Sequence, residues 1–255
     1  MKKSFKFLFL LILPFLLFVG CAKTPYTNRT QIVMVSPVQE SQMGYQAARE
    51  ILQKEKISHN RRLNALVKRV GIKIARVANQ PDYKWEFFVI DKDVLNAFCL
   101  PGGKVFVYTG IFKAARNEDQ LAVVMGHEIA HAIARHGAER MSMIQLSRMG
   151  KEIISQTVLK GSAYGGLFDT AYGLGEQFGV VLPYSRKFEY EADEIGLYLM
   201  TKAGYNPREA LRFWQNMLRL KRGGSQPEFL STHPADQNRI QRLKQLIPKA
   251  LKYYR

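Results

Sequence analysis

Residues 125–136 read MGHEIAHAIARH, and this stretch carries three of the five histidines in the chain. The residues around it, LAVVMGHEIAHAIA at 121–134, are almost entirely apolar. An asparagine that can cap a helix stands at position 117, two acidic residues follow it, and a glycine stands at 137. These are start and stop signals of a helix. We therefore expect an apolar helix from about Asn117 to His136, closed by Gly137.

Two histidines and one glutamate of this helix have the spacing of a metal site. Residues four apart on a helix project from the same face, so His127 and His131 can bind one ion. Glu128 lies next to the first ligand and can accept a proton from water, and H-E-x-x-H is the pattern of zinc metallopeptidases. An unpaired ionisable pair would be costly in so apolar a helix, which favours the metal site over a chance pattern. His136 is turned away from this face, and we expect it to be a helix-end cation.

A catalytic zinc takes three protein ligands and keeps one position for water. The candidate third ligand lies in SRKFEYEADEIG at 185–196. On a helix, Glu189 and Asp193 share a face, whereas Glu191 and Glu194 point elsewhere. We predict that Glu189 is the third ligand and that Asp193 accepts the free N–H of a ligand histidine. We expect the other two acids to be solvated.

Outside this region, helical and extended patterns predict the fold. Apolar periodicity and turn residues predict helices at about 39–56, 60–79, 185–203, 207–221 and 233–254. Aromatic and β-branched residues predict a strand at 83–90 and two strands within 94–112, joined through Pro101-Gly102-Gly103. We therefore expect an α+β, mostly α-helical fold with a small β-sheet. The glycine-rich stretch 161–182 is interpreted as a lid beside the site, with disorder as the alternative.

The first twenty residues have the features of an export signal. MKKSFK is cationic, and FLFLLILPFLLFV is an apolar run of signal-peptide length. Leu17-Phe18-Val19-Gly20-Cys21 resembles a bacterial lipobox, so cleavage would leave Cys21 as a lipid-carrying first residue. An ordinary signal peptide or a retained anchor is the alternative. We expect a signal peptide at 1–20, a lipidated tether at 21–38 and a zinc metallopeptidase domain at 39–255.

The chain is strongly basic, with 38 lysines and arginines against 21 acidic residues and a formal net charge of +17. No nucleic-acid recognition motif accompanies this charge, and exported proteins rarely meet nucleic acid. Attraction to anionic lipid headgroups fits better. The predicted 60–79 helix carries a basic stripe, which is usually a solvated surface; a membrane-facing role is the alternative.

Several stretches together resemble one enzyme family. H-E-I-A-H followed by E-Y-E-A-D is similar to the gluzincin peptidases that include HtpX and the CAAX prenyl endoproteases. Three further stretches are similar to the Oma-type branch of that family, whose members occur in mitochondria and as exported bacterial lipoproteins. They are NAFCLPGGKVFVYTGIF at 96–112, YSRKFEYEADEIGLYL at 184–199 and FLSTHPADQNRIQRL at 229–243. The resemblance covers about residues 40–250.

The resemblance implies a gluzincin core in which the edge strand of the sheet flanks the active-site helix. It implies one Zn²⁺ per chain, and it assigns the zinc ligands and the general base to the residues already named. These are His127, His131 and Glu189 as ligands and Glu128 as base.

Two further motifs acquire roles from the resemblance. His233 and Arg239 match an H-P-x-x-x-x-R motif whose histidine steadies the oxyanion or closes over the metal at rest, and the arginine is expected to assist. From chemistry alone, His233 could equally start a helix. Asn96, Ala97 and Phe98 resemble the edge strand against which the substrate backbone is laid.

The sequence therefore predicts a membrane-tethered zinc metalloendopeptidase that hydrolyses unfolded or misassembled envelope proteins in protein quality control. We expect contact with the membrane through the N-terminal lipid and no nucleic-acid partner; no oligomeric state is indicated. The location would be the periplasmic side of a membrane, and Ala22 favours the outer over the inner membrane. A non-hydrolytic chaperone using the same groove is the alternative, although pure binding needs no base at Glu128. A zinc hydrolase of cell-wall amide bonds is a weaker one.

Overall fold

The structure is a computed structural model in which the chain forms two compact units. It describes residues 20–157, 182–223, 228–233 and 237–254. The larger unit comprises Val38–Arg135 and Lys187–Arg255, and the smaller unit comprises Met1–Pro37 and His136–Arg186. The predicted lid at 161–182 falls outside the described residues, apart from its last residue.

A three-stranded sheet lies at the centre of the larger unit, with the strand order β3-β5-β4. β3 (Glu86–Ile90) pairs parallel with β5 (Lys104–Tyr108), and β4 (Ala97–Leu100) pairs antiparallel with β5. β5 is buried along its whole length, as a central strand should be, whereas β4 is an edge strand. The turn between β4 and β5 uses Gly102 and Gly103 at positive φ (81° and 91°), which glycine adopts without a steric penalty.

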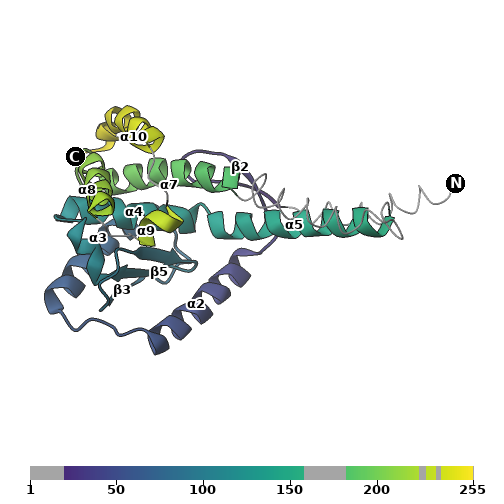
Figure 1. The fold of residues 1–255 in the computed structure, drawn as a ribbon, viewed down its shortest axis with the longest axis horizontal. Helices are drawn as coiled ribbons and strands as arrows, with labels where there is room; N and C mark the ends of the chain where they lie inside the picture. Colours follow the sequence, from purple (N-terminus) through teal and green to yellow (C-terminus); the bar gives the residue numbers. More distant parts are fainter. Residues whose placement is uncertain (1–19, 158–181, 224–227, 234–236, 255) are drawn as a thin grey trace. The chain divides into compact units, whose positions relative to one another are not determined.

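Helices cover both faces of this sheet (Figure 1). On one face, α2 (Pro37–Lys54) packs Ala48 against Ile90 and Phe106. On the other face lie α3 (Arg61–Ala78) and α4 (Glu118–Ile133), which also pack against each other, and α4 packs directly on β4. The other described elements of this unit are η1 (Thr109–Lys113), α7 (Leu182–Lys202, part of this unit from Lys187), α8 (Glu209–Arg222), α9 (Glu228–Thr232), α10 (Gln237–Ala250) and η3 (Leu251–Tyr253). The predicted α+β, mostly helical fold with an edge strand beside the histidine helix is confirmed.

The histidine helix begins as predicted but ends earlier. The Asn117 side chain accepts a hydrogen bond from the Gln120 backbone N–H (2.8 Å) and caps α4. The helix stops at Ile133 because Arg135 adopts a left-handed conformation (φ 58°), and α5 (His136–Thr157) starts at once. His136 therefore begins a second helix, is 2% exposed, and is not the predicted helix-end cation. The predicted closure by Gly137 was wrong as well, since a non-glycine residue makes the break and leaves no sequence signal.

The smaller unit contains α5 and a hairpin that the sequence did not indicate. β1 (Gly20–Lys23) and β2 (Thr30–Val33) pair antiparallel within the stretch expected to be a tether. Arg29 forms two hydrogen bonds with the Glu139 carboxylate of α5 (2.7 and 2.6 Å). Part of 21–38 is therefore packed on α5. Within the ranges that the structure describes, none of the helices combines the length and the apolarity needed to cross a membrane.

Candidate metal centre

Two glycines let α4 and α7 cross closely at the site. A Cβ added to Gly196 of α7 would lie 2.8 Å from the His127 backbone nitrogen, and one added to Gly126 of α4 would lie 2.9 Å from the Gly196 carbonyl oxygen. Contacts that short do not occur for real Cβ atoms, so the crossing needs glycine on both helices. Glu189 lies two turns before Gly196 on α7, and the crossing brings its carboxylate to His127.

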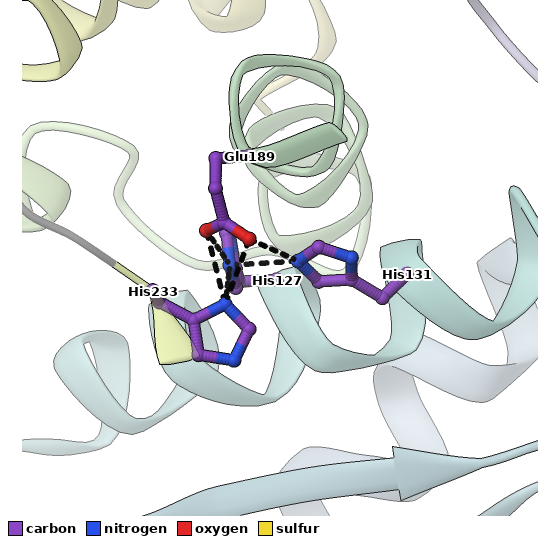
Figure 2. Close-up of side chains that lie close together, drawn as sticks. All are labelled: His127, His131, Glu189 and His233. Carbon is purple, nitrogen blue, oxygen red and sulfur yellow. Dashed lines mark hydrogen bonds and ion pairs between the residues drawn. The ribbon is translucent and has the colours of Figure 1, made fainter. Parts of the chain in front are cut away.

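Four side chains converge at this crossing (Figure 2). One ligand atom each from His127, His131, Glu189 and His233 lies within 4.8 Å of all the others. His127 Nε2 is 3.1 Å from His131 Nε2 and 3.2 Å from Glu189 Oε2, and His131 Nε2 is 3.3 Å from Glu189 Oε1. His233 Nδ1 lies 2.9 Å from Glu189 Oε2. The structure thus brings the three predicted ligands together and adds a fourth candidate.

The donor atoms fit zinc in kind and spacing. Ligand atoms about 2.0–2.1 Å from a tetrahedral ion lie about 3.3 Å apart, close to the separations observed here, and two imidazoles with one carboxylate form a known catalytic zinc set. Burial alone would lower the pKa of His127, but the Asp193 and Glu189 carboxylates outweigh burial and raise this pKa to about 9. Conversely, the surrounding imidazoles overcome burial and hold the pKa of Glu189 far below its usual range. A field that favours a proton here also favours a divalent cation.

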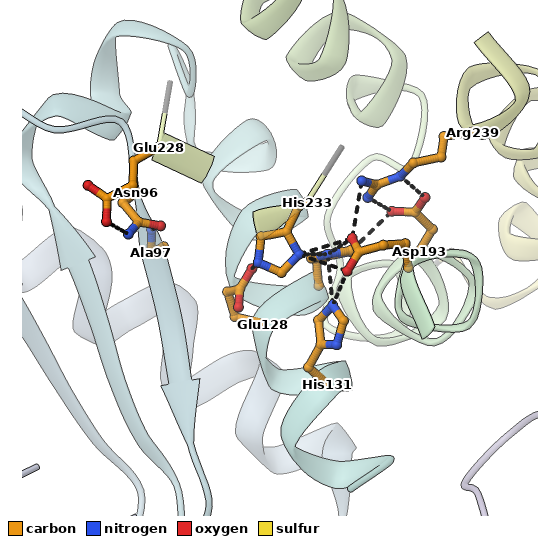
Figure 3. Close-up of polar contacts among 10 residues, drawn as sticks. Asn96, Ala97, Glu128, His131, Asp193, Glu228, His233 and Arg239 are labelled. Atoms are coloured by element: carbon orange, nitrogen blue, oxygen red, sulfur yellow. Dashed lines mark hydrogen bonds and ion pairs between the residues drawn. The ribbon is translucent and has the colours of Figure 1, made fainter. Parts of the chain in front are cut away.

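Glu128 points toward this cluster from α4 and is 3% exposed. Its Oε1 has no hydrogen-bond partner among the described residues, and His233 Nε2 lies 3.5 Å away (Figure 3). Burial raises the pKa of Glu128, and the nearby His233 and His127 offset part of this effect. A buried carboxylate oxygen without a partner requires an explanation, and a polar reactant at this position would supply one.

Two further side chains, Asp193 and Arg239, contact the predicted ligands (Figure 3). Asp193 Oδ1 lies 3.1 Å from His127 Nδ1. Arg239 donates to Asp193 through Nε (2.8 Å) and Nη2 (2.7 Å), and its Nη1 lies 3.1 Å from Glu189. Arg239 keeps the pKa of Asp193 below its usual value even though burial alone would raise it. The arginine is only 1% exposed, and its printed polar contacts are with these two carboxylates.

Two features of the site escaped sequence reasoning. Trp214 of α8 lies under the guanidinium of Arg239, with 4.1 Å from Cζ to the ring centroid, and meets the His127 ring edge-on at 6.4 Å. No local spacing signals this contact, because Trp214 lies on a separate helix. Glu191, expected to be solvated, is buried at 6% exposure. Glu194 is partly exposed and accepts a hydrogen bond from Tyr198 (3.3 Å).

The edge strand directs main-chain groups away from the sheet. Tyr108 N–H donates to the Asn96 carbonyl oxygen (3.1 Å), and β4 continues from Ala97 in antiparallel register with β5. Backbone groups alternate in direction along such a ladder, so those of Phe98 face β5 while those of Ala97 and Cys99 face outward. The Asn96 side-chain oxygen accepts the Ala97 N–H (2.9 Å). The predicted substrate strand therefore lies at an edge of the sheet.

The element that carries His233 is attached to the start of this edge. Phe229 N–H of α9 donates to the Leu95 carbonyl oxygen (3.0 Å), and the Asn96 side chain donates to Glu228 (3.2 Å; Figure 3). His233 N–H donates to Phe229 (2.8 Å) at the end of α9. Edge strand and cluster are thus joined through one short helix.

A buried base beside two imidazoles and a carboxylate meets the chemical needs of metal-assisted peptide hydrolysis. Together with the α+β core, this site defines a zinc metallopeptidase. The chain belongs to peptidase family M48, whose family model matches residues 61–247. It is therefore a zinc metalloendopeptidase, and two of its relatives are metalloendopeptidases by name.

Three relatives illustrate this similarity. The chain is 36% identical over 230 residues to the mitochondrial metalloendopeptidase OMA1 of Schizosaccharomyces pombe, covering 89% of this chain and 66% of that protein. It is 32% identical over 267 residues to the mitochondrial metalloendopeptidase OMA1 of Saccharomyces cerevisiae, covering 94% and 75%. It is 29% identical over 210 residues to the beta-barrel assembly-enhancing protease of Escherichia coli, covering 79% and 42%. The chain thus spans only part of each relative.

Proposed function

We propose that this chain is a membrane-tethered zinc metalloendopeptidase that hydrolyses peptide bonds of unfolded or misassembled envelope proteins. The observation that carries the proposal is the buried Glu128 carboxylate beside the histidine–glutamate cluster. Its Oε1 makes no hydrogen bond within the described residues, and His233 Nε2 lies 3.5 Å away. A groove that only held chains would gain nothing from a base at this position. A buried carboxylate oxygen without a hydrogen bond would cost free energy in such a groove.

Each polar residue of the site has a task in peptide hydrolysis. His127, His131 and Glu189 would hold the zinc, which when bound lowers the pKa of water from about 15.7 towards 7 and polarises the carbonyl. Glu128 accepts the proton as water attacks the carbonyl carbon and then delivers it to the leaving amine. Asp193 Oδ1 lies 3.1 Å from His127 Nδ1, where its charge would favour the tautomer that leaves the Nε2 lone pair available to the metal.

Arg239 acts through these residues. Its guanidinium contacts the Asp193 and Glu189 carboxylates, which supports a role as a positioning residue. His233 has two roles consistent with its place. Its Nε2 lies on the Glu128 side, where it can donate to the developing oxyanion, and its Nδ1 lies within the ligand cluster, where it can close the site at rest.

An extended substrate fits the edge strand β4. Main-chain hydrogen bonds to the Ala97 carbonyl and to the outward groups of Cys99 would provide affinity with little dependence on sequence. Only a locally unfolded chain can present its backbone in this way, which supports unfolded proteins as substrates. The relative in Escherichia coli is by its name a protease that enhances beta-barrel assembly, which supports envelope proteins as substrates and a role in quality control.

The tether is proposed from the N-terminal sequence. Residues 1–20 would be removed as a signal peptide, Cys21 would carry the lipid, and 39–255 would form the catalytic domain on the periplasmic side of a membrane. The outer membrane is favoured by Ala22. Metabolic labelling with a fatty acid should mark the wild type and not Cys21→Ser; equal labelling would contradict the assignment.

The catalytic proposal is tested by degradation of an unfolded model protein. Glu128→Gln should lower the cleavage rate by roughly 10²–10⁴-fold while still binding one zinc per chain. Glu194→Gln, a matched change on α7, should cleave like the wild type, and chelators should stop the wild type. Equal cleavage by the wild type and Glu128→Gln, or cleavage that survives chelation, would refute the mechanism.

The same preparation separates the alternative functions. A chaperone would suppress aggregation equally well with Glu128→Gln and would cleave nothing as wild type. A cell-wall amidase would release fragments from peptidoglycan and leave casein intact.

A further inference from the structure

The exposed face of α3 is cationic along its whole length. The helix sequence RRLNALVKRVGIKIARVA contains six basic residues and no acidic one. At about 100° per residue, the six fall within an arc of roughly 140°. The buried residues Val67, Val70 and Ile74 occupy the opposite side, which packs into the unit. The basic residues are Arg61, Arg62, Lys68, Arg69, Lys73 and Arg76.

Only part of this charge is neutralised within the protein. Arg69 pairs with Glu118 of α4 (2.7 Å), and Lys73 lies over the ring of Tyr205 (5.0 Å to the centroid). The other four basic residues of α3 are exposed and form no ion pair with any residue that the structure describes. These are Arg61, Arg62, Lys68 and Arg76.

An aromatic hollow adjoins the cationic face at the C-terminal end of α3. It has a volume of about 400 Å³ and is lined by Arg76, Tyr83, Trp85 and their neighbours. Tyr83 and Trp85 contact each other with ring centroids 5.2 Å apart. Tryptophan, tyrosine and arginine are the side chains that favour the interface between lipid headgroups and acyl chains. Asp82 is exposed nearby, but Lys84 balances it.

We propose that the four exposed cations and this hollow, together called the α3 surface, dock onto anionic lipid headgroups. The four charges are spread over a helix segment of roughly 22 Å, an array that suits many small phosphates in a plane. No acidic residue on the helix interrupts it, as would be needed to fix the register of one protein partner. Trp85 would lie against the headgroup layer beside Arg76, while the Tyr83 hydroxyl stays bonded to the Ala132 carbonyl oxygen (3.1 Å). This contact is separate from a lipid on Cys21 and does not depend on peptidase activity.

Vesicle partitioning tests the proposal with the full chain. All proteins carry Cys21→Ser, so that acylation does not mask weaker binding, and residues 1–20 are common to all of them. Vesicles of phosphatidylcholine alone are compared with vesicles that also contain about 30% phosphatidylglycerol. The first variant changes Arg61, Arg62, Lys68 and Arg76 to glutamine. The matched control removes the same charge from exposed positions elsewhere, by changing Lys221, Arg222, Lys244 and Lys249 to glutamine.

The α3 variant should lower the anionic-to-neutral partition ratio by roughly tenfold or more, and the control by less than about twofold. Thermal unfolding midpoints should match the wild type, since the changed side chains are exposed. In vesicles with brominated lipids, fluorescence of Trp85 should be quenched only when phosphatidylglycerol is present. The fluorescence of Trp214 should stay unquenched in both kinds of vesicle, because this side chain is buried.

Equal losses in both variants would overturn the proposal and leave only a general effect of net charge. An unchanged partition ratio in the α3 variant would overturn it as well. If that variant kept lipid binding but lost binding to polyglutamate, the surface would belong to an acidic protein partner.

Discussion

α3 and α4 are neighbouring helices that begin with the same kind of cap but differ in how deeply they are buried. Each is capped by an asparagine: Asn60 accepts from Arg62 N–H (3.1 Å), and Asn117 accepts from Gln120 N–H (2.8 Å). α3 then buries one apolar stripe and leaves its charges in water, whereas α4 is buried on nearly every side. A charged side chain that stays exposed keeps its hydration, so it costs little free energy on folding and remains available for binding at the surface. A buried polar group is retained only where partners or chemistry compensate for its desolvation.

The largest expected effect distinguishes a polar residue of α4 from one of α3. His131→Ala should abolish stoichiometric zinc binding and lower kcat/KM by more than the 10–100-fold typical of groups behind metal ligands, roughly 10³-fold. Arg69→Ala should change kcat/KM by less than about twofold, since it loses at most a surface ion pair. Zinc content and cleavage kinetics measure both. Similar losses in the two variants would contradict the contrast.

The next largest effect is expected at Arg239, which is buried against two carboxylates of the site, and it concerns the affinity for zinc. Arg239→Gln should raise the zinc dissociation constant by about 10–100-fold, and Arg239→Lys should recover part of the loss by retaining the charge. Arg242→Gln, an exposed neighbour on α10, serves as the control. A fall in kcat with unchanged zinc affinity would instead assign Arg239 to the oxyanion.

The close crossing that buries α4 predicts an effect on stability. Gly196→Ala should lower the free energy of unfolding by about 1–3 kcal/mol, since its Cβ meets the His127 backbone. Gly137→Ala has nothing within 4 Å of its Cβ and lies within a helix, so stability should stay equal or rise by up to about 1 kcal/mol. Denaturant titration compares the two. Equal free energies of unfolding in the two variants would mean that α4 and α7 can move apart without loss of stability.

The smallest effect is expected at the ion pair between Arg69 of α3 and Glu118 of α4. The hydrogen bond from Arg69 lowers the pKa of Glu118, so the pair stabilises the fold above the unfolded pKa of glutamate and loses that effect as pH falls through the lower folded value. Glu118→Gln should cost less than about 1 kcal/mol near neutral pH. The difference from wild type should vanish in acid and shrink in high salt. A cost that persists at low pH would point to another contact, such as that with Tyr205.

Local sequence signals anticipated much of the fold. Asn117 caps α4 as expected, α3 lies within a residue of its predicted bounds, and the turn at Gly102-Gly103 separates β4 from β5. The failures have a common cause. The break falls at Arg135, a non-glycine residue, while the nearby Gly137 lies inside α5 and stops nothing. The burial of Glu191 depends on packing from other elements. Periodicity describes a helix about its own axis and does not say what covers it.

By itself, the sequence determined the features that one helix or one turn imposes. Residues four apart share a face, so His127 and His131 had to point the same way, and Glu189 and Asp193 likewise. The tertiary structure alone decided that these two faces meet. It did so because Gly126 and Gly196 permit backbone contact between α4 and α7, and because Arg239 folds in behind two carboxylates that would otherwise be buried without a countercharge.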